Sequence, residues 1–135
     1  MNLKITKLEK IKNRNGYLVE FLKGTELEET QKKFAQIYIA TILPGAVRGN
    51  HYHKSKLEWF TILNGKVRVL LEDIKTKRRE DLILDSSENF LKRVLINNET
   101  AHAFKNISDS TVVLVVYTNK IYDPKKPDTY DYKLL

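Results

Sequence analysis

The placement of the three histidines is the feature that most constrains how this 135-residue chain can fold. They stand with one carboxylate and three turn or amide residues at fixed intervals: Gly45, five residues, His51, one residue, His53, four residues, Glu58, six residues, Gly65, and later His102, three residues, Asn106. Side chains alternate between the two faces of a β-strand, so His51 and His53 point the same way. Glu58 begins the next apolar run and can reach the same point. The spacing therefore predicts a β-barrel whose lumen gathers these side chains, with His102 arriving from a strand distant in sequence.

Imidazoles combined with one carboxylate suit a divalent Zn, Fe, Ni or Mn ion and leave room for water or substrate. A His-X-His pair alone is a weak signal, because short motifs are hypotheses until their context confirms them. Here the pair is part of a longer pattern that also includes Gly45, Gly65 and Asn106 at the intervals given above, which argues against coincidence. We therefore predict one metal site, with the ligands His51, His53, Glu58 and His102.

The rest of the chain reads almost entirely as strand and turn. Aromatic and β-branched runs predict strands at 17–22, 34–42, 58–63, 66–71, 81–84, 93–96, 101–107 and 111–118. Asn64-Gly65 is a hairpin signal between two of these runs. Only 25–33 has a pattern that suits a helical turn or two, or a loop. Many short strands with frequent turns predict an all-β barrel or sandwich.

Length and composition predict one domain over residues 1–135, since 41% hydrophobic residues suffice for a single core. The chain has no cysteine, which excludes disulfides, thiolate metal sites and a cysteine nucleophile. Its first residues lack the apolar run of a signal peptide, and no stretch approaches the roughly 20 apolar residues of a membrane span. We expect a cytoplasmic protein that does not bind membranes.

The net charge of +7, from 24 Lys and Arg against 17 Asp and Glu, would attract an anion. The densest basic cluster, 75–79, lies between two strand-like runs and reads as a solvated hairpin turn. No aromatic residues of the kind that stack on bases accompany it, so we do not expect nucleic acid as a partner. A phosphorylated small molecule fits better, with Arg48, Lys54 and Arg68 as candidate substrate-binding residues near the predicted site.

The intervals from Gly45 to Gly65 and from His102 to Asn106 form the cupin signature, and two blocks resemble known sugar-nucleotide enzymes. Arg48-Gly49-Asn50-His51-Tyr52-His53 is similar to the Arg-Gly-Leu-His-Tyr-Gln block of dTDP-4-dehydrorhamnose 3,5-epimerases, and Ala101-His102-Ala103-Phe104 resembles their second block. The chain resembles even more the C-terminal cupin domain of bifunctional capsular-polysaccharide enzymes. That domain has an Asn-His-Tyr-His block and ends in Asp-Pro-X-X-Pro-Asp-Thr-Tyr; the ending here is Asp123-Pro124-Lys125-Lys126-Pro127-Asp128-Thr129-Tyr130.

These resemblances imply a cupin jelly-roll β-barrel of the RmlC-like type, which commonly pairs as a homodimer, and a UDP- or dTDP-linked sugar as ligand. They imply epimerisation or keto-isomerisation next to the carbonyl of a 4-keto-6-deoxyhexose, a reaction that needs a base, an acid and stabilisation of oxyanion charge. Tyr38 and Tyr52 are the candidate proton carriers. Arg48 matches an arginine that contacts substrate in the epimerases.

Two roles for His51 compete. The histidine at this position is the base in the metal-free rhamnose-pathway epimerases, where Gln stands in place of His53. In the capsular-enzyme domain the cluster resembles a zinc site. Because His53 and Glu58 are both present, we favour the ligand role and zinc as the metal.

Several further expectations concern packing around the site. Cupins usually place Pro-X-Gly before the last histidine, whereas this chain has Asn97-Asn98-Glu99, and Glu is poorly suited to left-handed turn geometry. We expect the turn that delivers His102 to differ in shape. Trp59 alternates with Glu58 and should face away from the lumen. The tail after Asp123 should pack against the barrel or a partner subunit.

Three classes of function remain open from the sequence. The favoured class is a sugar-nucleotide epimerase or keto-isomerase of surface-polysaccharide biosynthesis. The second is a metal-dependent small-molecule cupin enzyme such as an oxygenase, and the third is a non-catalytic ligand-binding cupin.

Overall fold

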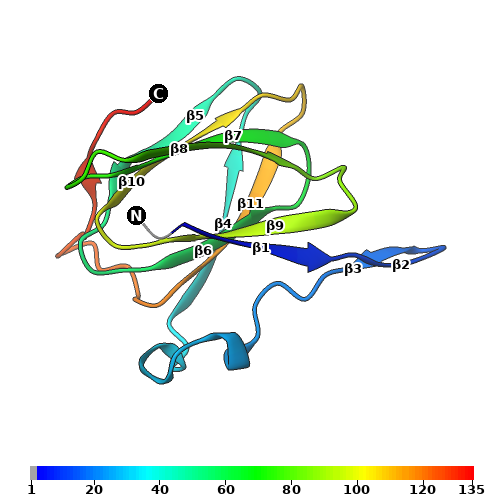
Figure 1. Cartoon of the computed structure of the whole chain (residues 1–135), viewed down its shortest axis with the longest axis horizontal. Coiled ribbons are helices and arrows are strands. Elements are labelled where there is room, and N and C mark those ends of the chain that lie inside the picture. Colours follow the sequence, from blue (N-terminus) through cyan, green and yellow to red (C-terminus); the bar gives the residue numbers. More distant parts are fainter. Residues whose placement is uncertain (1–2) are drawn as a thin grey trace.

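Two five-stranded antiparallel sheets face each other in the computed structural model, which describes residues 3–135 (Figure 1). The first sheet has the order β1 (Lys4–Glu9), β9 (Phe90–Ile96), β6 (Glu58–Ile62), β11 (Val112–Thr118) and β4 (Gln36–Ile42). The second has the order β12 (Tyr130–Asp131), β5 (Val47–Tyr52), β10 (Thr100–Asn106), β7 (Lys66–Asp73) and β8 (Arg79–Asp85). The expected all-β class is confirmed.

The core lies between the two sheets and follows the period-2 pattern of the strands. On β7, Val67, Val69 and Leu71 are fully buried, while Lys66 and Arg68, which alternate with them, face outward. Facing side chains from the first sheet complete the core: Ile42, Phe60, Ile62, Val94, Ile96, Val112, Leu114 and Val116. Trp59 alternates with Phe60 and packs on the outer face against Tyr117, as its position predicted.

The N-terminal third differs most from the expected strands. The run expected as a strand at 17–22 is a strand only over β3 (Gly16–Leu18), which pairs with β2 (Ile11–Asn13) in a hairpin that projects away from the barrel (Figure 1). All residues of both strands are exposed. The pairing ends at Leu18, and residues 19–22 are not part of a strand. β1 was not expected, because only Leu8 in it is buried against β9.

The segment between the hairpin and β4 contains two short 3₁₀ turns, Gly24–Glu26 and Glu29–Gln31, where a helical turn or a loop was expected. They lie below the first sheet in Figure 1. Arg93, which is buried on β9, anchors this segment by donating to the Phe21 carbonyl and pairing with the Glu26 carboxylate at 2.8 Å. None of the helical turns within residues 3–135 is long and apolar enough to cross a membrane.

Candidate active site

The strand that carries the first two histidines contains a bulge. On β5, His51 pairs with His102, but the next residue of β10, Ala103, pairs with Gly49, so Asn50 is an extra residue in the ladder. Gly49 has a φ of 91° and Asn50 a φ of 56°. Arg48 and His51 are three residues apart and would lie on opposite faces of a regular strand. Because of the bulge, both line the same cavity between the sheets.

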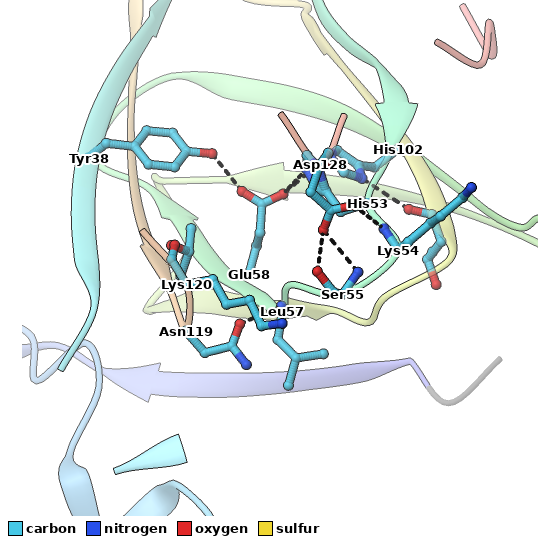
Figure 2. A network of polar contacts seen from close by, with 12 residues as sticks. Tyr38, His53, Lys54, Ser55, Leu57, Glu58, His102, Asn119, Lys120 and Asp128 are labelled. Atoms are coloured by element: carbon cyan, nitrogen blue, oxygen red, sulfur yellow. Dashed lines mark hydrogen bonds and ion pairs between the residues drawn. The ribbon is translucent and has the colours of Figure 1, made fainter. Parts of the chain in front are cut away.

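Three histidines and Glu58 converge at this cavity, and His51, Glu58 and His102 line it. His53 Nε2 lies 2.7 Å and His102 Nε2 3.4 Å from the same oxygen, Oε1, of Glu58. The three imidazoles offer ligand atoms that all lie within 4.8 Å of one another. Figure 2 shows Glu58 reaching from β6 toward His53, with His102 beside them. The structure thus brings all four predicted metal ligands together.

Backbone carbonyls orient two of these rings. His53 Nδ1 lies 2.6 Å from the Asp128 carbonyl oxygen, and His102 Nδ1 lies 3.1 Å from that of Thr100. A carbonyl only accepts, so each Nδ1 carries a hydrogen, and the Nε2 of each ring is directed toward Glu58 Oε1. The buried Nε2 of His53 meets no polar partner other than the Glu58 carboxylate. Two oriented imidazole nitrogens and a carboxylate that meet at one point are a donor set that fits a divalent metal ion.

The electrostatic environment assigns charges to the cluster. Burial alone would raise the pKa of the Glu58 carboxyl, but the hydrogen bond to His53 and the neighbouring His102 hold it well below its usual range. Burial and the neighbouring His53 lower the pKa of His51, and burial lowers the pKa of His102 to about 4. At neutral pH the site therefore has an ionised Glu58 beside neutral imidazoles at 51 and 102.

Tyr38 and Arg48 bring two further functional groups to the cavity. The Tyr38 hydroxyl donates to Glu58 Oε2 at 2.6 Å, as Figure 2 shows. Burial beside the Glu58 charge raises the pKa of Tyr38, so the hydroxyl keeps its proton at neutral pH. Arg48 Nε donates to the Thr41 carbonyl at 2.7 Å, across the gap from β5 to β4. The remaining wall is largely apolar: Ala40, Phe60, Ile96, Phe104, Leu114 and Val116.

Three predicted site residues lie elsewhere, which corrects their assignment to the site. Tyr52 alternates with the two histidines, faces the outside of the barrel and stacks on Tyr130 with ring centroids 5.3 Å apart. Lys54 follows the end of β5 and places its ammonium 4.2 Å from the centre of the Tyr130 ring. Arg68 alternates with core residues of β7 and pairs with Asp81 at 2.7 Å on the outer face.

We expected the turn before His102 to differ in shape from a Pro-X-Gly turn, but Glu99, which stands at the glycine position, adopts the backbone conformation that glycine favours. Glu99 adopts a φ of 59°, in the left-handed region that glycine would favour. Its N–H donates to the His53 carbonyl at 2.5 Å, and its carboxylate pairs with Lys75 at 2.7 Å. These contacts hold the strained turn, and His102 reaches the cluster.

Sequence reasoning missed the part that the C-terminal tail plays at the site. The Asp128 carboxylate accepts hydrogen bonds from the N–H groups of Lys54 and Ser55, and its carbonyl contacts His53. The Asp-Pro-X-X-Pro-Asp pattern was noted, but nothing in its spacing indicates which strand the tail joins. The motif residue Asn106 proves to be structural: its amide donates to the Ile42 and Ser110 carbonyls, which ties β10 to the end of β4 and to the turn before β11.

Comparison with known proteins gives relatives in polysaccharide biosynthesis. Over 130 residues the chain is 25% identical to the spore coat polysaccharide biosynthesis protein SpsL of Bacillus subtilis, covering 93% of this chain and 84% of the relative. It is 27% identical over 115 residues to the UDP-2-acetamido-2,6-beta-L-arabino-hexul-4-ose reductase of Pseudomonas aeruginosa, covering 85% of this chain but 28% of that enzyme. The chain therefore corresponds to SpsL over most of its length and to less than a third of the reductase.

Solved structures with the same fold include sugar-nucleotide enzymes. The dTDP-sugar isomerase of Desulfovibrio desulfuricans superposes with a TM-score of 0.82 at 19% identity, covering 97% of this chain and 83% of that one. The capsular polysaccharide assembling protein CapF of Staphylococcus aureus superposes with a TM-score of 0.70 at 24% identity, covering 94% of this chain and 34% of that one. These similarities show that the fold is the RmlC-like cupin jelly roll.

A family profile decides the membership of the chain. The profile for the polysaccharide biosynthesis C-terminal domain matches residues 11–130, which is most of the sequence and includes every residue of the cavity described above. This RmlC-like cupin therefore belongs to the polysaccharide biosynthesis C-terminal domain family.

Proposed function

We propose that the protein is a sugar-nucleotide epimerase or keto-isomerase that acts next to the carbonyl of a UDP- or dTDP-linked 4-keto-6-deoxyhexose in surface-polysaccharide biosynthesis. One observation carries the proposal: a single cavity combines the protonated hydroxyl of Tyr38, the guanidinium of Arg48 and the cluster around Glu58. The family and the names of the relatives support a role in polysaccharide biosynthesis.

His51, His53, Glu58 and His102 would hold one divalent metal ion, which we propose to be zinc. The support is the donor set itself, in which two oriented imidazoles direct their Nε2 atoms at one carboxylate oxygen and the third ring lies beside them. When bound, such an ion supplies Lewis-acid stabilisation of the negative charge that develops on the keto oxygen.

Tyr38 is the proton donor in this proposal. Epimerisation transfers a proton from the carbon beside the carbonyl to a base, which we propose is a water molecule, and returns a proton from Tyr38 to the opposite face. Tyr38 is then reprotonated from water, so the formula of the sugar is unchanged. A phenol that keeps its proton at neutral pH can deliver it to the enolate carbon. Its hydrogen bond to Glu58 Oε2 fixes the direction of the hydroxyl within the cavity.

Arg48 is the proposed contact for the diphosphate. A guanidinium grips phosphate oxygens through paired hydrogen bonds, and the bond from Nε to the Thr41 carbonyl orients the group at the cavity wall. His51 is assigned as a metal ligand. A neutral imidazole in the cavity is also chemically able to act as the base, and the zinc content and exchange activity of His51→Ala distinguish the two roles.

We also propose that the protein is a homodimer. β4 is the edge strand of the first sheet, and its outward-facing Ile37 and Ile39 are 53% and 69% exposed. An apolar edge strand invites pairing with another chain, and a second copy would cover it.

The proposed activity is tested by proton exchange. Zinc-loaded protein is incubated in deuterated water with UDP- and dTDP-linked 4-keto-6-deoxyhexoses, and the sugars are followed by NMR. We expect deuterium at ring carbon 3 or 5, and none in a parallel incubation without protein beyond the slow background. If no substrate takes up deuterium while the protein binds zinc, the epimerase proposal fails. Oxygen uptake with iron-loaded protein would then favour an oxygenase, and ligand binding without turnover a binding cupin.

A further inference from the structure

The C-terminal segment Asp128–Leu135, here called the C-terminal strap, is hydrogen-bonded to β5, the strand that carries His51. Its residues 130 and 131 pair with β5 as β12. The Tyr132 N–H donates to the Asn50 carbonyl, and the Asn50 side chain contacts the backbone of Leu134 and Leu135 at 2.8 to 3.0 Å. The strap is therefore attached at the bulge that sets the register of His51.

Asp128 links the strap to His53 in two ways. Its carboxylate accepts the Lys54 N–H at 2.8 Å and the N–H and hydroxyl of Ser55 at 2.9 and 2.7 Å, which caps the turn after β5. Its carbonyl oxygen lies 2.6 Å from His53 Nδ1. Figure 2 shows the Asp128 carboxylate above Ser55 and next to the His53 ring. One residue thus fixes both the backbone that follows His53 and the direction of its imidazole.

We propose that Asp128 is a positioning residue for His53: its carboxylate cap holds its own carbonyl against Nδ1, so that Nε2 is directed at Glu58. The inference rests on the proposed metal site for its functional meaning. Hydrogen bonds from the second nitrogen of a ligating histidine orient the ring and raise its basicity. The C-terminal strap is therefore part of the site, although none of its side chains lines the cavity.

The test compares Asp128→Ala with Asp123→Ala, a matched loss of a carboxylate from the same tail. The Asp123 carboxylate accepts the Lys125 N–H within its own turn and not the turn after β5. Zinc affinity is measured by competition with a chromophoric chelator. The ring nitrogens of His53 are followed by ¹⁵N NMR in the metal-free proteins at one pH. We expect Asp128→Ala to bind zinc about 10- to 100-fold more weakly and to change the His53 ring signals, whereas Asp123→Ala matches wild type.

Folded Asp128→Ala protein with wild-type zinc affinity and wild-type His53 signals would overturn the proposal, whatever its melting temperature. If Asp128→Ala does not fold, the same two measurements are made on Asp128→Asn and Ser55→Ala, because each of these changes removes part of the cap. If wild-type protein binds no zinc, the proposed function has failed, and the spectra of the metal-free proteins alone decide whether Asp128 positions the ring.

Discussion

Replacing Gly49 by alanine should destabilise the protein far more than the same change at Gly45. Both glycines have positive φ, 91° and 75°, so alanine at either position carries a strain of about 1–2 kcal/mol. A Cβ at Gly45 would meet nothing within 4 Å. A Cβ at Gly49 would lie 2.6 Å from the His102 carbonyl oxygen and 3.2 Å from Ala103 Cα, both backbone atoms of β10.

The difference between the two variants isolates the overlap. Backbone atoms cannot move aside as a flexible side chain can, and overpacking of this kind costs about 1–3 kcal/mol. The reduced entropy of the unfolded chain favours both alanines by the same roughly 0.4–1 kcal/mol and cancels in the comparison. We therefore expect the free energy of unfolding of Gly49→Ala to be about 1–3 kcal/mol lower than that of Gly45→Ala. For a chain of this length that corresponds to a melting temperature lower by roughly 3–15 °C.

Urea denaturation followed by circular dichroism measures both free energies of unfolding, and zinc affinity is measured on the same samples. The overlap pushes β5 away from β10 where His51 pairs with His102, so Gly49→Ala should also bind zinc more weakly. Equal stabilities and equal zinc affinities for the two variants would refute the assignment of Gly49 to the close approach in the bulge.

Three further variants probe other parts of the structure. Tyr38→Phe should keep its zinc but lose about 10²- to 10⁴-fold in deuterium exchange into the sugar, and unchanged exchange would remove Tyr38 as proton donor. Ile39→Asp should turn a dimer into a folded monomer in sedimentation velocity, and a wild-type monomer would disprove the dimer. The hydrogen bond from Tyr132, aided by Arg79, holds the pKa of Glu72 below its unfolded value of 4.5, so its stabilisation is present above pH 4.5 and is lost as pH falls through the folded pKa. Glu72→Gln should be less stable at pH 7 and lose less stability between pH 5 and 3; identical pH profiles would contradict this.

Much of the fold could be predicted because its signals are local. The strands β4 and β6 to β11 lie in apolar runs that end at turn residues, and the structure forms each of them to within a few residues of its predicted bounds. β1 and the C-terminal β12 escaped prediction because one has a single buried residue and the other has only two exposed ones. Their positions depend on partners that no local pattern specifies.

The candidate site was predicted where alternation along a strand suffices and missed where it does not. His51, His53 and Glu58 follow from spacing alone. Arg48 reaches the cavity only through the bulge at Asn50, for which the Gly-Asn pair is the available signal. Tyr52 and Arg68 could have been placed outside by the same alternation, since each neighbours residues that face inward. The contact of Asp128 with His53 joins residues 75 positions apart and required the structure.

The central claim is that His51, His53, Glu58 and His102 hold one metal ion that the proposed reaction needs. Its most direct test measures zinc content and deuterium exchange side by side in wild type, His51→Ala, His53→Ala and Glu58→Ala. We predict about one zinc per wild-type chain, and a loss of zinc together with exchange in all three variants, because each removes one member of a shared coordination sphere. Full zinc occupancy in an exchange-dead His51→Ala protein would contradict the assignment of His51 and make it the base, and wild-type protein that binds no divalent metal would contradict the claim as a whole.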